Sequence, residues 1–384
     1  MEEVKSSVEE LPLASMSTLA GIPGSYMVLE WGRGLDSWFW SPSFWLPEGY
    51  SWEDLKSTEH KQYPEFREIL TYPVVFALFI LAFRFYILNP FLFEPFARRA
   101  GLKYKRYVPP PRNDYLEKLL DGRSNLPEKE LCAAAKKLGW TTREVERWVR
   151  QKKQGGKLTK LDKFQESVFI TSYHIIISIY GLYIMIGKPW LKDISHTWLG
   201  YPLHEIDNWQ WWYYIISVSF YFALCVSHLR CGLTSYFHHA CTILLLVFSW
   251  SCNLVRVGSL VLLIHECGDI FLQSIKICQY LKKQRAADVL LPFFLIVWIS
   301  TRVILFPFWV FKNMYFEAPK FIFMPAGYMF YVLLLGLLAL NVLWTGMIGL
   351  VIVKSCLQGR TVEDIRSAES SNDGNDENEK VKDQ

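Results

Sequence analysis

The sequence predicts an all-α membrane protein, a polytopic bundle of about seven transmembrane helices. Hydrophobic residues make up 51% of the 384-residue chain and aromatic residues 16%, which is high for a soluble protein of ordinary charge. Apolar runs of roughly 20 residues, the length that spans a bilayer core, recur along the chain. We expect spans at about 72–96, 167–187, 210–229, 234–255, 257–278, 288–311 and 327–353.

The segment before the first span, residues 1–71, is rich in tryptophan. An indole keeps its N–H in contact with water at a membrane interface, so this segment is predicted to form a luminal cap next to the first span, 72–96. The tryptophans suited to that place are Trp38, Trp40, Trp45 and Trp52.

The basic segment 97–164 sets the expected orientation in the membrane. It holds 19 Lys and Arg against 8 Asp and Glu, a net charge of +11. Because basic loops stay on the cytosolic side, this segment is predicted to be cytosolic, with the N-terminus in the lumen and the C-terminus in the cytosol. The acidic tail, 356–384, has too little apolar surface to fold and is predicted to be disordered. Its Lys380 and Lys382 resemble a retrieval signal of endoplasmic-reticulum membrane proteins.

A small soluble insert is predicted at about 113–154, inside the basic segment. Its last part, with Trp148 followed by basic residues, resembles a homeodomain recognition helix, which Thr141 or Thr142 would cap. Gln151 stands where homeodomains place the Asn that reads adenine. Specific nucleic-acid binding is therefore not predicted, and a basic surface near anionic lipid headgroups is favoured.

Ionisable residues gather in two adjacent predicted spans, 234–255 and 257–278. An Asp in hydrocarbon costs at least about 2.5 kcal/mol on insertion scales, so such groups usually face a cavity or one another. His265 and Asp269 are four residues apart and share a helix face, where the carboxylate would fix the imidazole tautomer and raise its basicity. A general base or a nucleophilic histidine needs both properties. The candidate catalytic residues are His238, His239, His265, Glu266 and Asp269.

Two alternatives compete with a catalytic role for these residues. A metal site is not predicted, because the adjacent His238 and His239 point in different directions on a helix and would chelate poorly. A lone membrane histidine such as His174 is interpreted as a packing residue with one interhelical hydrogen bond.

On these motifs the chain resembles the longevity-assurance ceramide synthases, members of the TLC-domain membrane family. The paired histidines are followed by Asn-x-x-Arg-x-Gly and then by a His-Glu-Cys-Gly-Asp run, and the truncated homeobox-like insert fits the animal synthases. The resemblance implies a six-span TLC domain at 165–355 and one accessory N-terminal span. The supporting motif residues are Asn253, Arg256, Gly258 and Arg302.

The resemblance also implies an activity, the N-acylation of sphinganine or sphingosine with a fatty acyl-CoA, giving dihydroceramide or ceramide plus CoA. Acyl-CoA would be a co-substrate, and no permanently bound cofactor is expected. Either His238 carries the acyl group as an acyl-imidazole, or the histidine pair deprotonates the amine, with Asp269 and Glu266 orienting the imidazoles. The link at roughly 312–325 would affect the acyl-chain length. A homodimer or a heterodimer with a related synthase is expected.

Four positions depart from the family pattern. Glu266 replaces the usual Asp, Val226 and Cys231 replace acidic residues, and Gln273 replaces a Glu. These departures leave an alternative, a non-catalytic TLC-domain protein of the endoplasmic reticulum that senses lipids, moves lipids or escorts cargo. The histidines kept together with Asp269 favour the enzyme.

Overall fold

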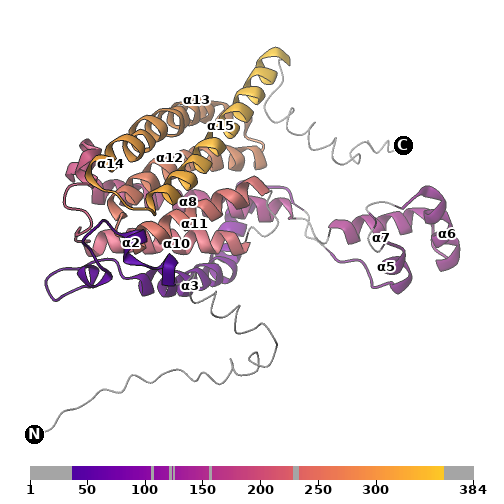
Figure 1. Ribbon diagram of the computed structural model, residues 1–384. Helices are drawn as coiled ribbons and strands as arrows, with labels where there is room; N and C mark the ends of the chain where they lie inside the picture. The colour runs from indigo at the N-terminus through magenta and orange to yellow at the C-terminus, as the bar shows by residue number, and fades with distance from the viewer. Residues whose placement is uncertain are drawn as a thin grey trace, which may run out of the picture.

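The computed structural model describes residues 37–104, 108–120, 123, 126–154, 158–227 and 233–358. Within these ranges the chain forms helices and turns and no strand, so the all-α prediction is confirmed. Long helices pack side by side into a bundle, and three short helices form a separate unit (Figure 1). The predictions for residues 1–36, for Cys231 and for the tail with Lys380 and Lys382 lie outside the described residues.

A long helix covers most of each of the seven predicted spans, and the helix of the span predicted at 234–255 ends at Ser251. Four of these helical segments, Phe66–Arg99, Lys160–Met185, Gln284–Phe321 and Gly327–Lys354, are long and apolar enough to cross a membrane. The chain is therefore a multi-pass membrane protein, while the count of seven spans stays a prediction. In order, the helices are α3 (Phe66–Phe83) with η3 (Arg84–Phe93) and α4 (Glu94–Arg99), α8 (Lys160–Met185), α10 (Asn208–Ser227), α11 (Leu233–Ser251), α12 (Val255–Tyr280), α13 (Gln284–Trp298) with η5 (Ile299–Phe311), η6 (Asn313–Glu317) and α14 (Ala318–Phe321), and α15 (Gly327–Gln358).

Two predicted links are shorter in the structure. The link expected at about 312–325 is helical as far as Phe321, because π-helical turns around Pro307 carry the helix past the missing proline N–H. The connection between the spans predicted at 234–255 and 257–278 is a turn over residues 252–254, and α12 begins at Val255. Asn253 takes a left-handed backbone conformation in this turn, with φ of 60°, which Asn tolerates better than most residues.

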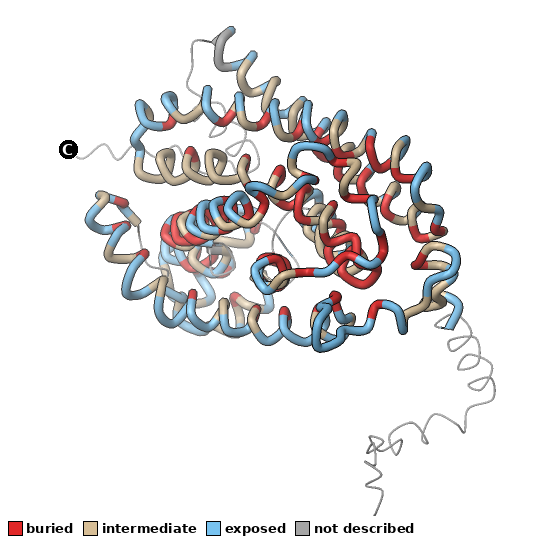
Figure 2. The backbone as a smooth tube through the Cα atoms, turned by 90° about the vertical axis from the view of Figure 1, so that its left-hand side faces the viewer, coloured by how far each residue is buried: buried red, intermediate tan, exposed pale blue. Residues whose placement is uncertain are grey.

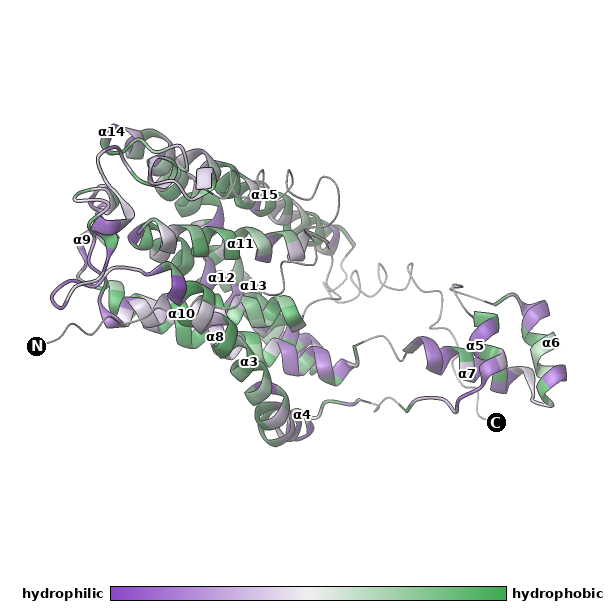
Figure 3. Cartoon of the chain, turned by 60° about the horizontal axis from the view of Figure 1, so that its bottom comes forward, coloured by the Kyte–Doolittle hydropathy of each residue, from purple (hydrophilic) through white to green (hydrophobic). Residues whose placement is uncertain are grey.

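Apolar side chains cover both the interior and the outer surface of the bundle. The interior contains buried aromatic residues such as Trp250 and Tyr213, and buried segments face inward along the long helices (Figure 2). The outer face exposes large residues such as Phe79, Ile176 and Val332. In Figure 3 most of the bundle is coloured green, for hydrophobic residues, while the small unit carries more purple, for hydrophilic ones. A surface of this kind suits contact with lipid.

The small unit consists of α5 (Asp114–Leu120), α6 (Glu128–Leu138) and α7 (Thr142–Gln154). It has its own core, in which Trp148 is buried and donates its indole N–H to Pro111 O at 2.7 Å. Of the two threonines proposed as caps, Thr141 forms a capping box with Glu144. This contact lowers the pKa of the Glu144 carboxyl. Smaller helices α2 (Pro42–Trp45) and η2 (Trp52–Leu55) precede α3, while α9 (Pro189–Lys192) and η4 (Ile194–Thr197) lie between α8 and α10.

Candidate active site

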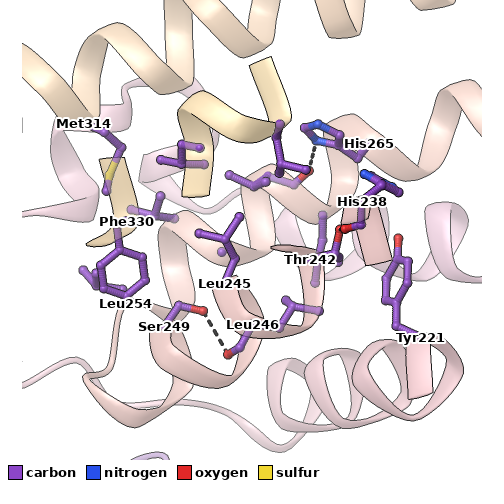
Figure 4. Close-up of a pocket in the computed structure, with 16 residues that line it drawn as sticks. Tyr221, His238, Thr242, Leu245, Leu246, Ser249, Leu254, His265, Met314 and Phe330 are labelled. Atoms are coloured by element: carbon purple, nitrogen blue, oxygen red, sulfur yellow. Dashed lines mark hydrogen bonds between the residues drawn. The ribbon is translucent and has the colours of Figure 1, made fainter. Parts of the chain in front are cut away.

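A narrow, mostly apolar cavity of about 50 Å³ lies inside the bundle. Figure 4 shows His238, His265 and Tyr221 at one end of it and Met314 and Phe330 at the other. The residues that line it come from α10, α11, α12, η6 and α15. Besides those five they are Thr242, Leu245, Leu246, Ser249, Leu254, Val257, Gly258, Val261, Leu262, Leu334 and Leu337.

Two imidazoles from neighbouring helices meet at the polar end of the cavity. His238 on α11 packs edge-on against Trp344, and His265 on α12 packs edge-on against Phe306. The Nδ1 atom of His238 and the Nε2 atom of His265 are buried and have no hydrogen-bond partner among the described residues. Each histidine therefore has a ring nitrogen available for chemistry at this end.

The tautomer of His265 follows from its one hydrogen bond. Its Nδ1 atom lies 2.8 Å from Val261 O. A carbonyl oxygen can only accept, so Nδ1 carries the proton and Nε2 of the neutral ring keeps its lone pair. His265 thus has the form of a general base, fixed by the backbone of its own helix.

The contact expected between His265 and Asp269 is not formed. Helical side chains lean toward the N-terminus of their helix, and His265 reaches back to Val261 instead of forward to Asp269. Asp269 faces Arg302, with Oδ2 3.5 Å from Nη2, and the buried Arg302 also donates from Nη2 to His265 O at 2.8 Å. Arg302, predicted only as motif support, therefore joins the histidine and the carboxylate.

Glu266 belongs to a second, more deeply buried cluster. Its Oε2 atom lies 2.5 Å from Nδ1 of His174 on α8, and its Oε1 atom accepts from the hydroxyls of Tyr173 and Tyr221 at 3.4 Å each. His174 is buried and makes the one interhelical hydrogen bond predicted for it, and its partner is the candidate residue Glu266. His239 does not line the cavity; its ring centroid lies 6.1 Å from that of Tyr221.

The Asn-x-x-Arg-x-Gly motif builds the start of α12. Asn253 donates from Nδ2 to Pro202 O at 2.6 Å and to His204 O at 2.8 Å. Arg256 donates to His196 O at 3.1 Å. Burial lowers the pKa of His204 to about 4, so this loop histidine is neutral at pH 7. These residues position the start of α12, at the end of the cavity away from His238 and His265.

Gly258 is needed because α10 comes close to α12. A Cβ atom at this position would lie 1.6 Å from the hydroxyl oxygen of Tyr214. We expect Gly258→Ala to destabilise the protein by about 1–3 kcal/mol or more through overpacking, measured as a lower Tm in detergent. Gly336→Ala is the matched control, since its Cβ would make an ordinary 3.6 Å contact with Phe237. Equal Tm values for the two variants would contradict the close approach.

In the ranges that the structure describes, no group of three or more His, Cys, Asp or Glu side chains is placed to hold a metal ion. The site consists of imidazoles, carboxylates and a guanidinium around an apolar cavity. It offers acid–base and nucleophilic chemistry on a substrate with a long apolar part.

Comparison with known proteins identifies the family. The TLC domain profile matches residues 163–349. Human ceramide synthase 5 is 32% identical over 371 residues, covering 94% of this chain and 92% of that protein. The chain belongs to the ceramide synthase family. Mouse ceramide synthase 3 is 32% identical over 343 residues, covering 86% of this chain and 87% of that protein, and human ceramide synthase 4 is 29% identical over 356 residues, covering 89% and 88%.

The profile match runs from α8 into α15, so the whole cavity of this ceramide synthase family member lies within its TLC domain. Of the departures from the family pattern, Glu266 is fully buried in the polar cluster. Val226 and Gln273 do not line the cavity, and Val226 is 56% exposed. Among the three departures that the structure describes, Glu266 is therefore the one in the polar cluster.

Proposed function

We propose that this member of the ceramide synthase family transfers a fatty acyl group from acyl-CoA to the 2-amino group of sphinganine or sphingosine. The products are dihydroceramide or ceramide and free CoA. The observation that carries this proposal is the apolar cavity that ends in two imidazoles, each with a buried ring nitrogen that has no hydrogen-bond partner in the described chain. The similar proteins are ceramide synthases, and the apolar cavity offers a place for part of a lipid substrate.

The residues at the polar end fit the proton transfers of this reaction. The amine nitrogen attacks the thioester carbonyl, the C–N bond forms, the C–S bond breaks, and the sulfur leaves as CoA thiolate. His265, with Nδ1 held by Val261, would take the proton from the amine on Nε2 and return it to the thiolate. His238 can act beside it in either of two ways, as a second base or as the acceptor of the acyl group on Nδ1.

The acyl chain would lie along the apolar part of the cavity, toward Met314 and Phe330. The cavity of about 50 Å³ holds roughly four water molecules, so a fatty acyl chain has to displace side chains on entry. Met314 lies in η6, inside the segment 312–325 that the family resemblance associates with acyl-chain length. We infer that this end of the cavity contacts the end of the chain.

The proposed function comes with a proposed location in the cell and a proposed oligomeric state. We infer a place in the endoplasmic reticulum membrane, with the basic segment 97–164 and the C-terminus in the cytosol, where CoA esters are present. The exposed Arg143, Arg147 and Arg150 of α7 would face anionic lipid headgroups. A homodimer, or a heterodimer with a related synthase, is proposed from the family resemblance.

The test is acyl transfer by purified protein in nanodiscs, with sphinganine and a panel of acyl-CoAs of different length. We expect one mole of free CoA thiol for each mole of dihydroceramide, with a preference for a limited range of chain lengths. Folded protein that binds acyl chains but forms no product with any acyl-CoA would favour the non-catalytic lipid-binding alternative.

A further inference from the structure

His174 belongs to none of the predicted motifs, and the role proposed for it here rests on the function proposed above. His174 lies on α8, where its imidazole is buried between two carboxylates of α12. Nδ1 lies 2.5 Å from Oε2 of Glu266, and Nε2 lies 3.9 Å from Oδ2 of Asp269. The ring therefore bridges the fully buried carboxylate and the one at the polar end of the site.

The two carboxylates differ in how far they are buried. The Glu266 side chain has no exposed surface, whereas the Asp269 side chain is 25% exposed. The Asp269 oxygen that faces His174 also faces Arg302, at 3.5 Å. Asp269 is thus held from two sides, by the imidazole and by the guanidinium, while part of its side chain stays accessible.

The charges around this cluster require a second cation. Glu266 and Asp269 carry two negative charges when ionised, and the buried Arg302 supplies one positive charge. An uncompensated charge buried in a membrane helix bundle is strongly unfavourable. The tyrosine hydroxyls near Glu266 are neutral donors at 3.4 Å and add no charge. A protonated His174 would donate from Nδ1 to Glu266 and place its positive charge 3.9 Å from Asp269 Oδ2, within ion-pair distance.

We propose that His174 is a positioning residue of the acyl-transfer site, which as an imidazolium balances Glu266 and holds Asp269 beside Arg302. The extra methylene of Glu266, relative to the Asp usual in the family, lets the carboxylate reach across from α12 to His174 on α8. The departure at position 266 and the histidine at 174 form one unit. Neither residue needs to touch the substrate.

The test is a double-mutant cycle of His174→Gln and Glu266→Gln in the full chain, with Tm and steady-state kinetics measured in nanodiscs. His174→Gln leaves a buried carboxylate unbalanced, so we expect kcat to fall at least about tenfold with little change in the KM for acyl-CoA, because Asp269 is misplaced. We expect its Tm to fall by about 4 °C or more. Adding Glu266→Gln removes the unbalanced charge and should restore most of the Tm and part of kcat.

Two comparisons keep the proposal falsifiable. Thr171→Val on the same helix also removes a buried polar group, one whose hydroxyl bonds Ser167 O, and it should leave kcat unchanged. Glu266→Asp shortens the reach to His174 and should lower kcat. Additive effects of His174→Gln and Glu266→Gln, or a wild-type kcat in His174→Gln, would overturn the proposal. If the wild type formed no ceramide, the proposed function would be wrong. The Tm values of the double-mutant cycle would still test whether His174 and Glu266 are coupled.

Discussion

Replacing His238 with Ala is expected to lower kcat for ceramide formation by at least about 100-fold, because a positioned acid–base or nucleophilic group typically contributes that much. The Nδ1 atom of His238 is buried at the polar end of the cavity and has no hydrogen-bond partner in the described part of the chain. The measurement is the rate of acyl transfer per mole of folded protein. His196→Ala is the matched control, since His196 lies on η4, away from the cavity, and its side chain is 44% exposed.

The same variant separates the two proposed roles of His238. Wild-type protein mixed with acyl-CoA in the absence of a sphingoid base would gain the mass of one acyl group if an acyl-imidazole forms. His238→Ala would not gain it. No mass gain in the wild type, together with loss of activity in the variant, assigns His238 as a base. A variant that keeps more than half of the wild-type rate contradicts both roles.

Replacing Arg302 with Met is expected to destabilise the protein by about 3–5 kcal/mol, the usual cost of removing one partner from a buried charge pair. Arg302 is buried and its guanidinium faces Asp269; it also bonds His265 O and, at 3.4 Å, Asn341 Oδ1. The loss is measured by chemical or thermal unfolding in detergent. Activity should fall as well, since the guanidinium links the His265 backbone to Asp269.

The control for this prediction is Arg285→Met, at an exposed arginine in the first turn of α13, which should unfold like the wild type. Adding Asp269→Asn to Arg302→Met removes the unpaired carboxylate and should restore part of the lost stability. If the double variant is no more stable than Arg302→Met alone, the pairing of Arg302 with Asp269 does not stabilise the fold.

The helices could be predicted from the sequence because apolar runs of roughly 20 residues span a bilayer core as helices. A long helix covers most of every predicted span. His238 and His265 line the cavity, while Glu266 contacts His174 and Asp269 faces Arg302. The spacing of polar residues within one helix pair was enough to find them. The helical continuation from residue 311 to Phe321 could not be predicted, because the predicted span follows the apolar run and residues 312–321 include charged and polar side chains.

The partners of the polar residues could not be predicted, because they depend on packing between helices far apart in the sequence. His174 and Glu266 are separated by 92 residues and meet because α8 packs on α12. A four-residue spacing also leaves open the direction of the side chain: His265 turned to Val261, and Asp269 turned to Arg302. The close approach of Tyr214 to Gly258 depends in the same way on how α10 packs on α12.

In the proposed reaction, the acyl chain occupies the cavity with its carbonyl at the end near His238 and His265. The most direct measurement uses a fatty acyl-CoA with a diazirine at the end of its chain, of a length that yields product, photolysed on the protein in nanodiscs. If the acyl chain lies in the cavity in this way, we expect cross-links at Met314, Phe330 and Leu254. Excess unlabelled acyl-CoA should suppress them. Cross-links confined to the outer, lipid-facing surface, with no label in the cavity while product still forms, would contradict it.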